Sequence, residues 1–196
     1  MIADIETDVT PRRLAVGISG ASGVIYGIRL LQLLQPTNIE THLVMSRSAE
    51  ITIAHETDMK IAAIRDLADA NYKQNDIGAA ISSGSVKTLG MVIAPCSVRT
   101  LAEIAGGVTS TLLTRAADVV LKERRKLVLM VRESPLHLGH LRNMAQATEM
   151  GAIIAPPVPA FYARPESLEQ MIDHTVGRTL DHFDIDVGAV KRWREN

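Results

Sequence analysis

The sequence is short of several features that would each indicate a particular class of protein. It has one cysteine, Cys96, in 196 residues, which excludes an intramolecular disulfide and a site built from several thiolates. It has no run of 18 consecutive apolar residues, so we expect no membrane-spanning helix and no membrane partner. Residues 1–11 are acidic and lack the pattern of a signal peptide, so we expect a cytoplasmic protein.

The sequence also lacks a surplus of charge of either sign. Its 21 Lys and Arg residues nearly balance its 22 Asp and Glu residues, and the formal net charge is -1. Because proteins that bind a phosphate backbone usually carry a basic surplus, we expect no nucleic-acid partner. Aromatic residues make up 3% of the chain and hydrophobic residues 46%. The core is therefore expected to be aliphatic, and each aromatic side chain becomes a candidate for a specific role.

What the sequence does contain is an alternation of strand-like and helix-like segments. Residues 1–11 are predicted to be a flexible tail and residues 12–196 to form one domain. The predicted strands are 13–19, 39–46, 91–96, 126–131 and 152–155. The predicted helices are 24–34, 47–55, 100–105, 115–123, 138–150 and 167–183, with a short helix and a loop in 59–80. This alternation predicts an α/β fold with a parallel sheet covered by helices on both faces.

In such folds ligands bind beyond the carboxyl ends of the strands, so the residues that follow each strand matter most. The first strand leads into Gly20-Ala21-Ser22-Gly23 at a helix start, where free backbone N–H groups attract anions. The spacing misses the dinucleotide pattern G-x-G-x-x-G, and Ser46 follows the second strand where an acid would bind ribose. A mononucleotide phosphate therefore fits better than NAD. The alternative is an ordinary turn with Ser22 as helix N-cap.

Two further strand ends carry candidate residues. Ser97 and Thr100 begin a helix after the third strand, and they either bind a ligand or only cap that helix. Cys96, just before them, is expected to be a small buried side chain. After the fourth strand, Arg132 could hold a phosphate and Glu133 could move a proton, although the two could also form a structural ion pair.

Three residues outside the strand ends could have either a functional or an ordinary structural role. Tyr162 follows a proline-rich loop, and it either closes a pocket or simply packs with its hydroxyl in water. His137 and His140 have a spacing that a metal could use, but no carboxylate or thiol partner is evident. We therefore expect no metal site.

Taken together, these segments closely resemble the UbiX-like flavin prenyltransferases over about residues 13–193. The resemblance is specific because five motifs occur in order at compatible spacing. Ile81-Ser82-Ser83-Gly84-Ser85 is most similar to the branch called the B subunit of phenolic or hydroxyarylic acid decarboxylases. The motifs are Gly20–Gly23, Ser46 with Pro95-Cys96-Ser97, Arg115–Glu123, Arg132-Glu133-Ser134-Pro135-Leu136, and Pro159-Ala160-Phe161-Tyr162.

The resemblance implies a flavodoxin-like (Rossmann-like) three-layer fold that binds FMN. It implies transfer of a dimethylallyl group from dimethylallyl phosphate to N5 and C6 of reduced FMN, without a metal. The product, prenylated FMN, would be supplied to a UbiD-like decarboxylase as partner. The family also implies a homo-oligomer, a dodecamer in its known members.

The resemblance assigns roles to individual residues. Glu56 and Glu133 are the expected acid–base pair, and Arg115 is expected to reach the site of a neighbouring subunit. The residues expected at the cofactor are Gly20, Ala21, Ser22, Ser46, Ser97, Val98, Arg99, Thr100, Arg115 and Arg132. The residues expected around the prenyl phosphate are Lys122, Arg132, Tyr162 and Arg178.

Two other functions remain open at this point. One is a flavin-dependent cysteine decarboxylase, a related group with the same fold that uses a catalytic histidine early in the chain. The first histidine here is His42, so that residue is missing. The other is a non-catalytic FMN carrier.

Overall fold

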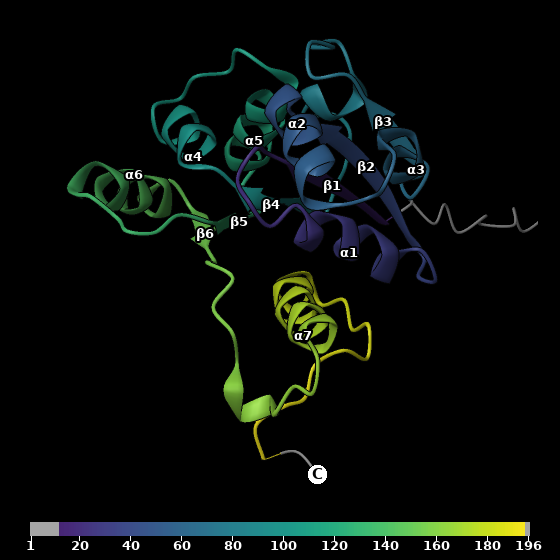
Figure 1. The fold of residues 1–196 in the computed structure, drawn as a ribbon. Helices are drawn as coiled ribbons and strands as arrows, with labels where there is room; N and C mark the ends of the chain where they lie inside the picture. The colour runs from purple at the N-terminus through teal and green to yellow at the C-terminus, as the bar shows by residue number, and fades with distance from the viewer. Residues whose placement is uncertain (1–11, 195–196) are drawn as a thin grey trace, which may run out of the picture.

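A central sheet of six parallel strands organises the residues that the computed structural model describes, 12–194 (Figure 1). The predicted tail, residues 1–11, lies outside this range. Five of the six strands match the predicted ones closely. The strands are β1 (Arg12–Ile18), β2 (Ile39–Met45), β3 (Ala70–Tyr72), β4 (Gly90–Cys96), β5 (Lys126–Val131) and β6 (Ala152–Ile154).

The order of the strands creates a switch point in the middle of the sheet. The order is β3-β2-β1-β4-β5-β6, so the chain builds outward from β1 to β3 and then crosses back to β4. Strand β1 pairs in parallel with both neighbours, and Leu14 lies opposite Thr41 of β2 and Gly90 of β4. Loops leave β1 and β4 in opposite directions at such a point, which opens a crevice at their carboxyl ends.

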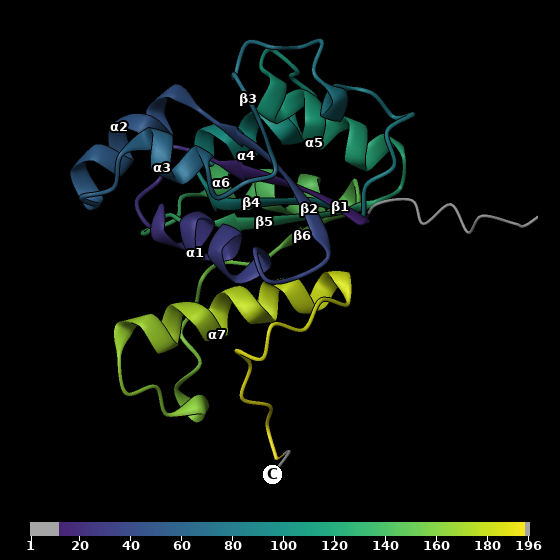
Figure 2. The ribbon, with the colours of Figure 1, turned by 90° about the vertical axis from the view of Figure 1, so that its right-hand side faces the viewer.

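Helices cover both faces of the sheet and complete the three layers (Figure 2). Helices α1 and α7 lie below the sheet in that view, and α4 and α5 lie above it. The helices are α1 (Ile25–Leu34), α2 (Arg47–Glu56), α3 (Ile61–Arg65), α4 (Val98–Ala105), α5 (Leu112–Lys122), α6 (Leu138–Glu149) and α7 (Leu168–Leu180). Short 3-10 turns occur at Ala80–Ser82, Phe161–Ala163 and Asp181–Phe183.

The two faces of the sheet bury separate aliphatic cores. Leu14, Val16 and Ile18 of β1 belong to one core, together with residues of α1 and α7. Ala15, between Leu14 and Val16, belongs to the other core, with residues of α4 and α5. This alternation follows from the two-residue period of a strand. Both cores are almost free of aromatic side chains, as the composition predicts.

The segment 59–80 departs from the prediction. It contains the expected short helix α3, but it also contains strand β3, which pairs in parallel with β2 at the edge of the sheet. Three residues with one exposed side chain are too few to show strand periodicity. The pairing with β2, a tertiary contact, is what makes this segment a strand.

Candidate active site

The glycine loop after β1 already holds an anion from its own chain. The carboxylate of Glu56, at the end of α2, accepts hydrogen bonds from the backbone N–H groups of Gly23 (2.8 Å) and Val24 (3.2 Å). It also accepts one from the Ser22 side chain. The N-cap position of α1 is Val24, without a side-chain cap bond. The interpretation of Ser22 as N-cap is therefore wrong, because the carboxylate of Glu56, a residue distant in sequence, accepts the hydrogen bonds at the start of α1.

These contacts keep Glu56 ionised. Burial by itself would raise the pKa of Glu56, but the hydrogen bonds from Ser22, Gly23 and Val24 and the nearby charge of Arg132 lower it below its ordinary value. At neutral pH Glu56 is thus a carboxylate, able to accept a proton but not to donate one. The effect of Arg132 on this pKa shows that the end of β5 lies near the Glu56 carboxylate.

A pocket of about 180 Å³ opens at the carboxyl ends of β1, β2 and β4, where the switch point predicts a ligand. We call it the flavin-edge pocket, after the cofactor that the resemblance predicts there. Five of the residues predicted at the cofactor line it: Gly20, Ser46, Ser97, Arg99 and Thr100. The other residues of its wall are Ser48, Gln74, Glu103, Thr111 and Leu113.

Three helices begin at the wall of the flavin-edge pocket. The hydroxyl of Ser46 accepts from the N–H of Ala49 (3.0 Å) at the start of α2, and Ser97 accepts from the N–H of Thr100 (3.2 Å) at the start of α4. Thr111 caps α5. The positive ends of three helix dipoles therefore point toward one small space, which favours an anionic group.

The close approach of two loops sets the width of this pocket. A side chain on Gly20 would place its Cβ 2.3 Å from Cβ of Ser48. Only glycine lets the loop after β1 lie directly against the start of α2. Gln74 fixes the far side, since its side-chain oxygen accepts from the N–H of Arg47 (2.7 Å).

The strand exit after β5 carries the second predicted acid–base residue. Glu133 is partly buried, and its carboxylate accepts a hydrogen bond from the backbone N–H of Ser134 (2.9 Å). Arg132 is exposed, and its backbone N–H is bonded to the carbonyl of Cys96 (3.0 Å). This bond ties the exits of β4 and β5 together. Cys96 is buried, so the prediction of a small buried side chain is confirmed, and burial raises the pKa of its thiol far above the ordinary value.

Tyr162 and Arg178 line a second pocket, of about 240 Å³, between the loop after β6 and helix α7. The ring of Tyr162 lies edge-on to His174 (5.6 Å between centroids) and to Trp193 (5.5 Å). Arg178 forms an ion pair with Asp181. Burial and the charges of Arg178 and Lys126 lower the pKa of His182, which also lines this pocket. No motif in the sequence indicated His174 and His182 as neighbours of this site.

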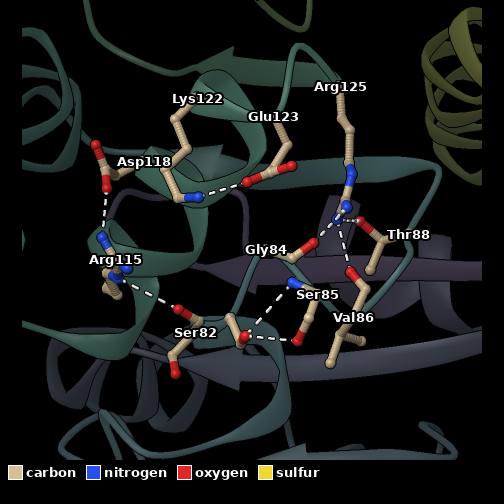
Figure 3. Close-up of polar contacts among 11 residues, drawn as sticks. Ser82, Gly84, Ser85, Val86, Thr88, Arg115, Asp118, Lys122, Glu123 and Arg125 are labelled. Atoms are coloured by element: carbon tan, nitrogen blue, oxygen red, sulfur yellow. Dashed lines mark hydrogen bonds and ion pairs between the residues drawn. The ribbon is translucent and has the colours of Figure 1, made fainter.

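Lys122 and Arg115 lie on a third surface, along α5 (Figure 3). Arg115 donates to the carbonyl of Ser82 (3.3 Å) and to Asp118 (2.7 Å). Lys122 lines a pocket of about 480 Å³ between α5 and the loop after α4. Within residues 12–194, predicted site residues thus line three separate pockets on three surfaces of the chain, whereas Glu56, Arg132 and Glu133 line none of the three.

No three His, Cys, Asp or Glu side chains gather as a metal site in residues 12–194. Within the same range no helix is long and apolar enough to cross a membrane.

This fold, with a polar pocket at the switch point of its parallel sheet, is typical of nucleotide-binding α/β proteins, and comparisons with known proteins identify the chain as a flavoprotein. Residues 2–185 match the family model described as "Flavoprotein". The flavin prenyltransferase UbiX of Escherichia coli K12 is 63% identical over 175 residues, covering 89% of this chain and 93% of that protein. The chain therefore belongs to the flavin prenyltransferase family, and the resemblance seen in its motifs is confirmed.

Two solved structures show how far the fold agrees. AnUbiX (PadA1), crystallised with FMN and dimethylallyl pyrophosphate, has a TM-score of 0.92 at 51% identity, over 94% of this chain and 98% of that one. A dodecameric FMN-dependent UbiX-like decarboxylase from Escherichia coli O157:H7 has a TM-score of 0.91 at 47% identity, over 93% and 100%. The predicted flavodoxin-like α/β fold is confirmed. Relatives of this kind favour prenyl transfer over cysteine decarboxylation.

Proposed function

We propose that this chain transfers a dimethylallyl group from dimethylallyl phosphate to reduced FMN, forming prenylated FMN. Membership of the flavin prenyltransferase family supports the reaction. The observation that carries the assignment to this chain is the flavin-edge pocket, with hydroxyl side chains and three helix starts at the switch point of the sheet.

The residues of the flavin-edge pocket fit FMN. A phosphate would match the positive ends of α2, α4 and α5, and Ser46, Ser97 and Thr100, which line the pocket, would offer it their hydroxyl groups. Gly20, Ala21 and Ser22 would follow the flavin along the loop after β1, with Val98 and Arg99 at the start of α4. Reduced FMN would supply the nucleophilic N5 and C6 positions that receive the dimethylallyl group.

The cationic and hydroxyl residues are suited to a phosphate leaving group. When the carbon–oxygen bond of an allylic phosphate breaks, negative charge grows on the phosphate oxygens. Arg178, Lys122 and Arg132 would stabilise that charge, and the Tyr162 hydroxyl would donate a further hydrogen bond. The family relative AnUbiX was crystallised with a prenyl diphosphate, so the donor could also be the diphosphate in this chain.

We assign the main proton transfer to Glu133 and a mainly structural role to Glu56. Closing a new ring at C6 releases a proton, and Glu133 at the strand exit would accept it. Glu56 is held as a carboxylate by three hydrogen bonds, so its first part is to order the loop Gly20–Gly23 and to balance Arg132. A carboxylate with a lowered pKa is a weak base and a poor acid at neutral pH.

The three separate surfaces suggest a site shared between copies of the chain. A second copy would bring Arg115 and Lys122, and another would bring Tyr162 and Arg178, to the flavin-edge pocket. The dodecameric relative supports a homo-oligomer of that size. The product would pass to a UbiD-like decarboxylase, and we propose a cytoplasmic location for both steps.

Anaerobic incubation with reduced FMN and dimethylallyl phosphate, followed by mass spectrometry of the flavin, tests the reaction. A mass increase of one five-carbon unit is the expected result. Tight binding of an unchanged flavin would instead support the non-catalytic carrier.

Mixing two inactive variants tests the shared site. Gly20→Val blocks the flavin-edge pocket, and Arg178→Met removes a phosphate contact on another surface. If sites form between copies, mixed oligomers regain part of the activity, because some sites combine an intact surface from each variant. Mixtures without any activity, at confirmed subunit exchange, would contradict the shared site.

A further inference from the structure

The ammonium group of Lys122 is held by the next residue in the chain. Its Nζ donates to Oε1 of Glu123 at 2.5 Å (Figure 3). Adjacent residues on a helix do not normally face each other. They meet here because α5 ends at Lys122 and Glu123 is the C-cap, where the backbone leaves the helix.

The turn that follows is closed by its own backbone. The N–H of Arg125 bonds to the carbonyl of Val120 (2.9 Å), and the N–H of Arg124 bonds to that of Leu121 (3.0 Å). This is the Schellman arrangement of a helix end, with Arg124 left-handed at φ 57°. A residue other than glycine costs about 1 kcal/mol in that conformation, so other contacts must hold the turn.

Arg125 provides those contacts by binding the serine-rich loop 82–88. Its guanidinium donates to the carbonyls of Gly84 (2.8 Å) and Val86 (2.6 Å) (Figure 3). The same loop is tied to the first turn of α5, where Arg115 donates to the carbonyl of Ser82. The end of α5 and the loop therefore form one unit.

Gly84 makes room for the Lys122–Glu123 pair against that loop. A Cβ on Gly84 would lie 2.2 Å from Oε1 of Glu123 and 2.8 Å from Nζ of Lys122. The carboxylate and the ammonium thus lie directly on the backbone of residue 84. This confines an otherwise flexible lysine, whose side chain is still 46% exposed and accessible to a ligand.

We propose that Glu123 is a positioning residue for the prenyl donor: with Gly84, it holds the Lys122 ammonium in the orientation that binds the donor phosphate. This inference rests on the proposed function, in which Lys122 binds that phosphate. An ammonium has three N–H donors, so one can remain with Glu123 while others bind phosphate oxygens. Holding the side chain in advance reduces the rotamer entropy that is lost on binding.

If the Lys122–Glu123 pair served only the fold, Glu123→Gln would lower the melting temperature and leave KM unchanged. Because exposed ion pairs contribute little to folding, we expect the melting temperature to stay almost unchanged. The glutamine keeps the size of the side chain but gives up the charge that holds the ammonium.

The experiment measures KM for dimethylallyl phosphate, kcat and the FMN dissociation constant in Glu123→Gln, Lys122→Met and the double variant, with oligomer size as a control. For Glu123→Gln we expect KM to rise roughly three- to fivefold at nearly constant kcat and FMN affinity. Glu123→Asp should recover part of this loss. For Lys122→Met we expect a rise of about tenfold or more. In the double variant, the loss of Glu123 should add nothing to the loss of Lys122.

Additive effects in the double variant, an unchanged KM in Glu123→Gln, or a change of oligomer size with that variant would each overturn the positioning role. If Lys122→Met itself left KM unchanged, the proposed function of Lys122 would fail instead, so the two failures are distinct. Gly84→Ala gives a second approach, with an expected rise in KM as the added methyl group displaces the pair. Gly78→Ala is its matched control, because a Cβ there meets only Asp76 at 3.7 Å.

Discussion

The flavin-edge pocket and the surface around Lys122 both carry polar and charged groups, but different parts of the fold hold those groups in place. At the flavin edge, helix starts, hydroxyls and one carboxylate are arranged by the strands of a single sheet. Around Lys122, charged side chains are held by a helix end and a loop on the outside of the molecule. The first site is built by the fold of one chain, whereas the second presents its groups outward.

Under the proposed function, this difference would let a small domain hold two anionic ligands. One phosphate can be met by backbone dipoles, which carry no net charge and need no counterion. Gathering several Arg and Lys side chains around a second phosphate in the same chain would place like charges together without a ligand. Keeping Lys122 with Glu123 and Arg178 with Asp181 avoids that repulsion. Substitutions at the two surfaces test this contrast.

The largest effect is expected for Glu133→Gln. Glutamine keeps the oxygen that accepts from Ser134, so FMN should bind as before. Loss of the proton acceptor should lower turnover by a factor on the order of 10² to 10⁴. Single-turnover mass spectrometry of the flavin measures this, with Glu149→Gln, at the exposed end of α6, as the matched control. Full-rate turnover would remove Glu133 from the mechanism.

Gly20→Ala should disturb the flavin-edge pocket and leave the surface around Lys122 unchanged. The added methyl group would overlap Ser48, which we expect to cost about 1–3 kcal/mol in the free energy of unfolding and to weaken FMN binding. Chemical denaturation and flavin fluorescence measure the two effects, with Gly78→Ala as control. Normal FMN affinity in a folded variant would show that the loop lies away from the cofactor.

Glu56→Gln should lower stability in a pH-dependent way. Losing a charged group at the start of α1 should cost about 1 kcal/mol at neutral pH. The folded pKa of Glu56 lies below its ordinary 4.5, so the wild type has its full advantage above that pH and loses it as the pH falls through the folded pKa. Urea denaturation from pH 7 to pH 3 should show the two proteins converging. A gap as large at pH 3 as at pH 7 would contradict this cause.

The smallest effect is expected for Arg99→Ala. The Arg99 side chain is 79% exposed and pairs with Glu103 one turn along α4 (3.0 Å). Such a pair contributes about 0.3–0.5 kcal/mol. FMN affinity should change little, since the backbone N–H groups of α4 remain in place. A loss of more than tenfold in titrations would instead make its guanidinium a direct ligand of FMN.

The flavin edge could be predicted from the sequence because its rules are local. Parallel strands bring their carboxyl ends to one edge, so the residues after β1, β2 and β4 had to meet. Ser97 as a helix cap was visible for the same reason. Gln74 and Leu113 could not be predicted, since they reach the pocket from a weakly patterned loop and from the first turn of α5. Thr111 could have been found, because Thr-Leu-Leu-Thr is a capping sequence.

The sequence alone determined the α/β alternation, the aliphatic core and the identity of the chemical groups, because periodicity and residue type are local properties of the chain. The packing of the folded chain places Glu56 at the start of α1 and makes β3 a strand. It also separated Lys122 and Arg178 onto different surfaces. Those outcomes depend on contacts between distant segments, which no window of sequence contains.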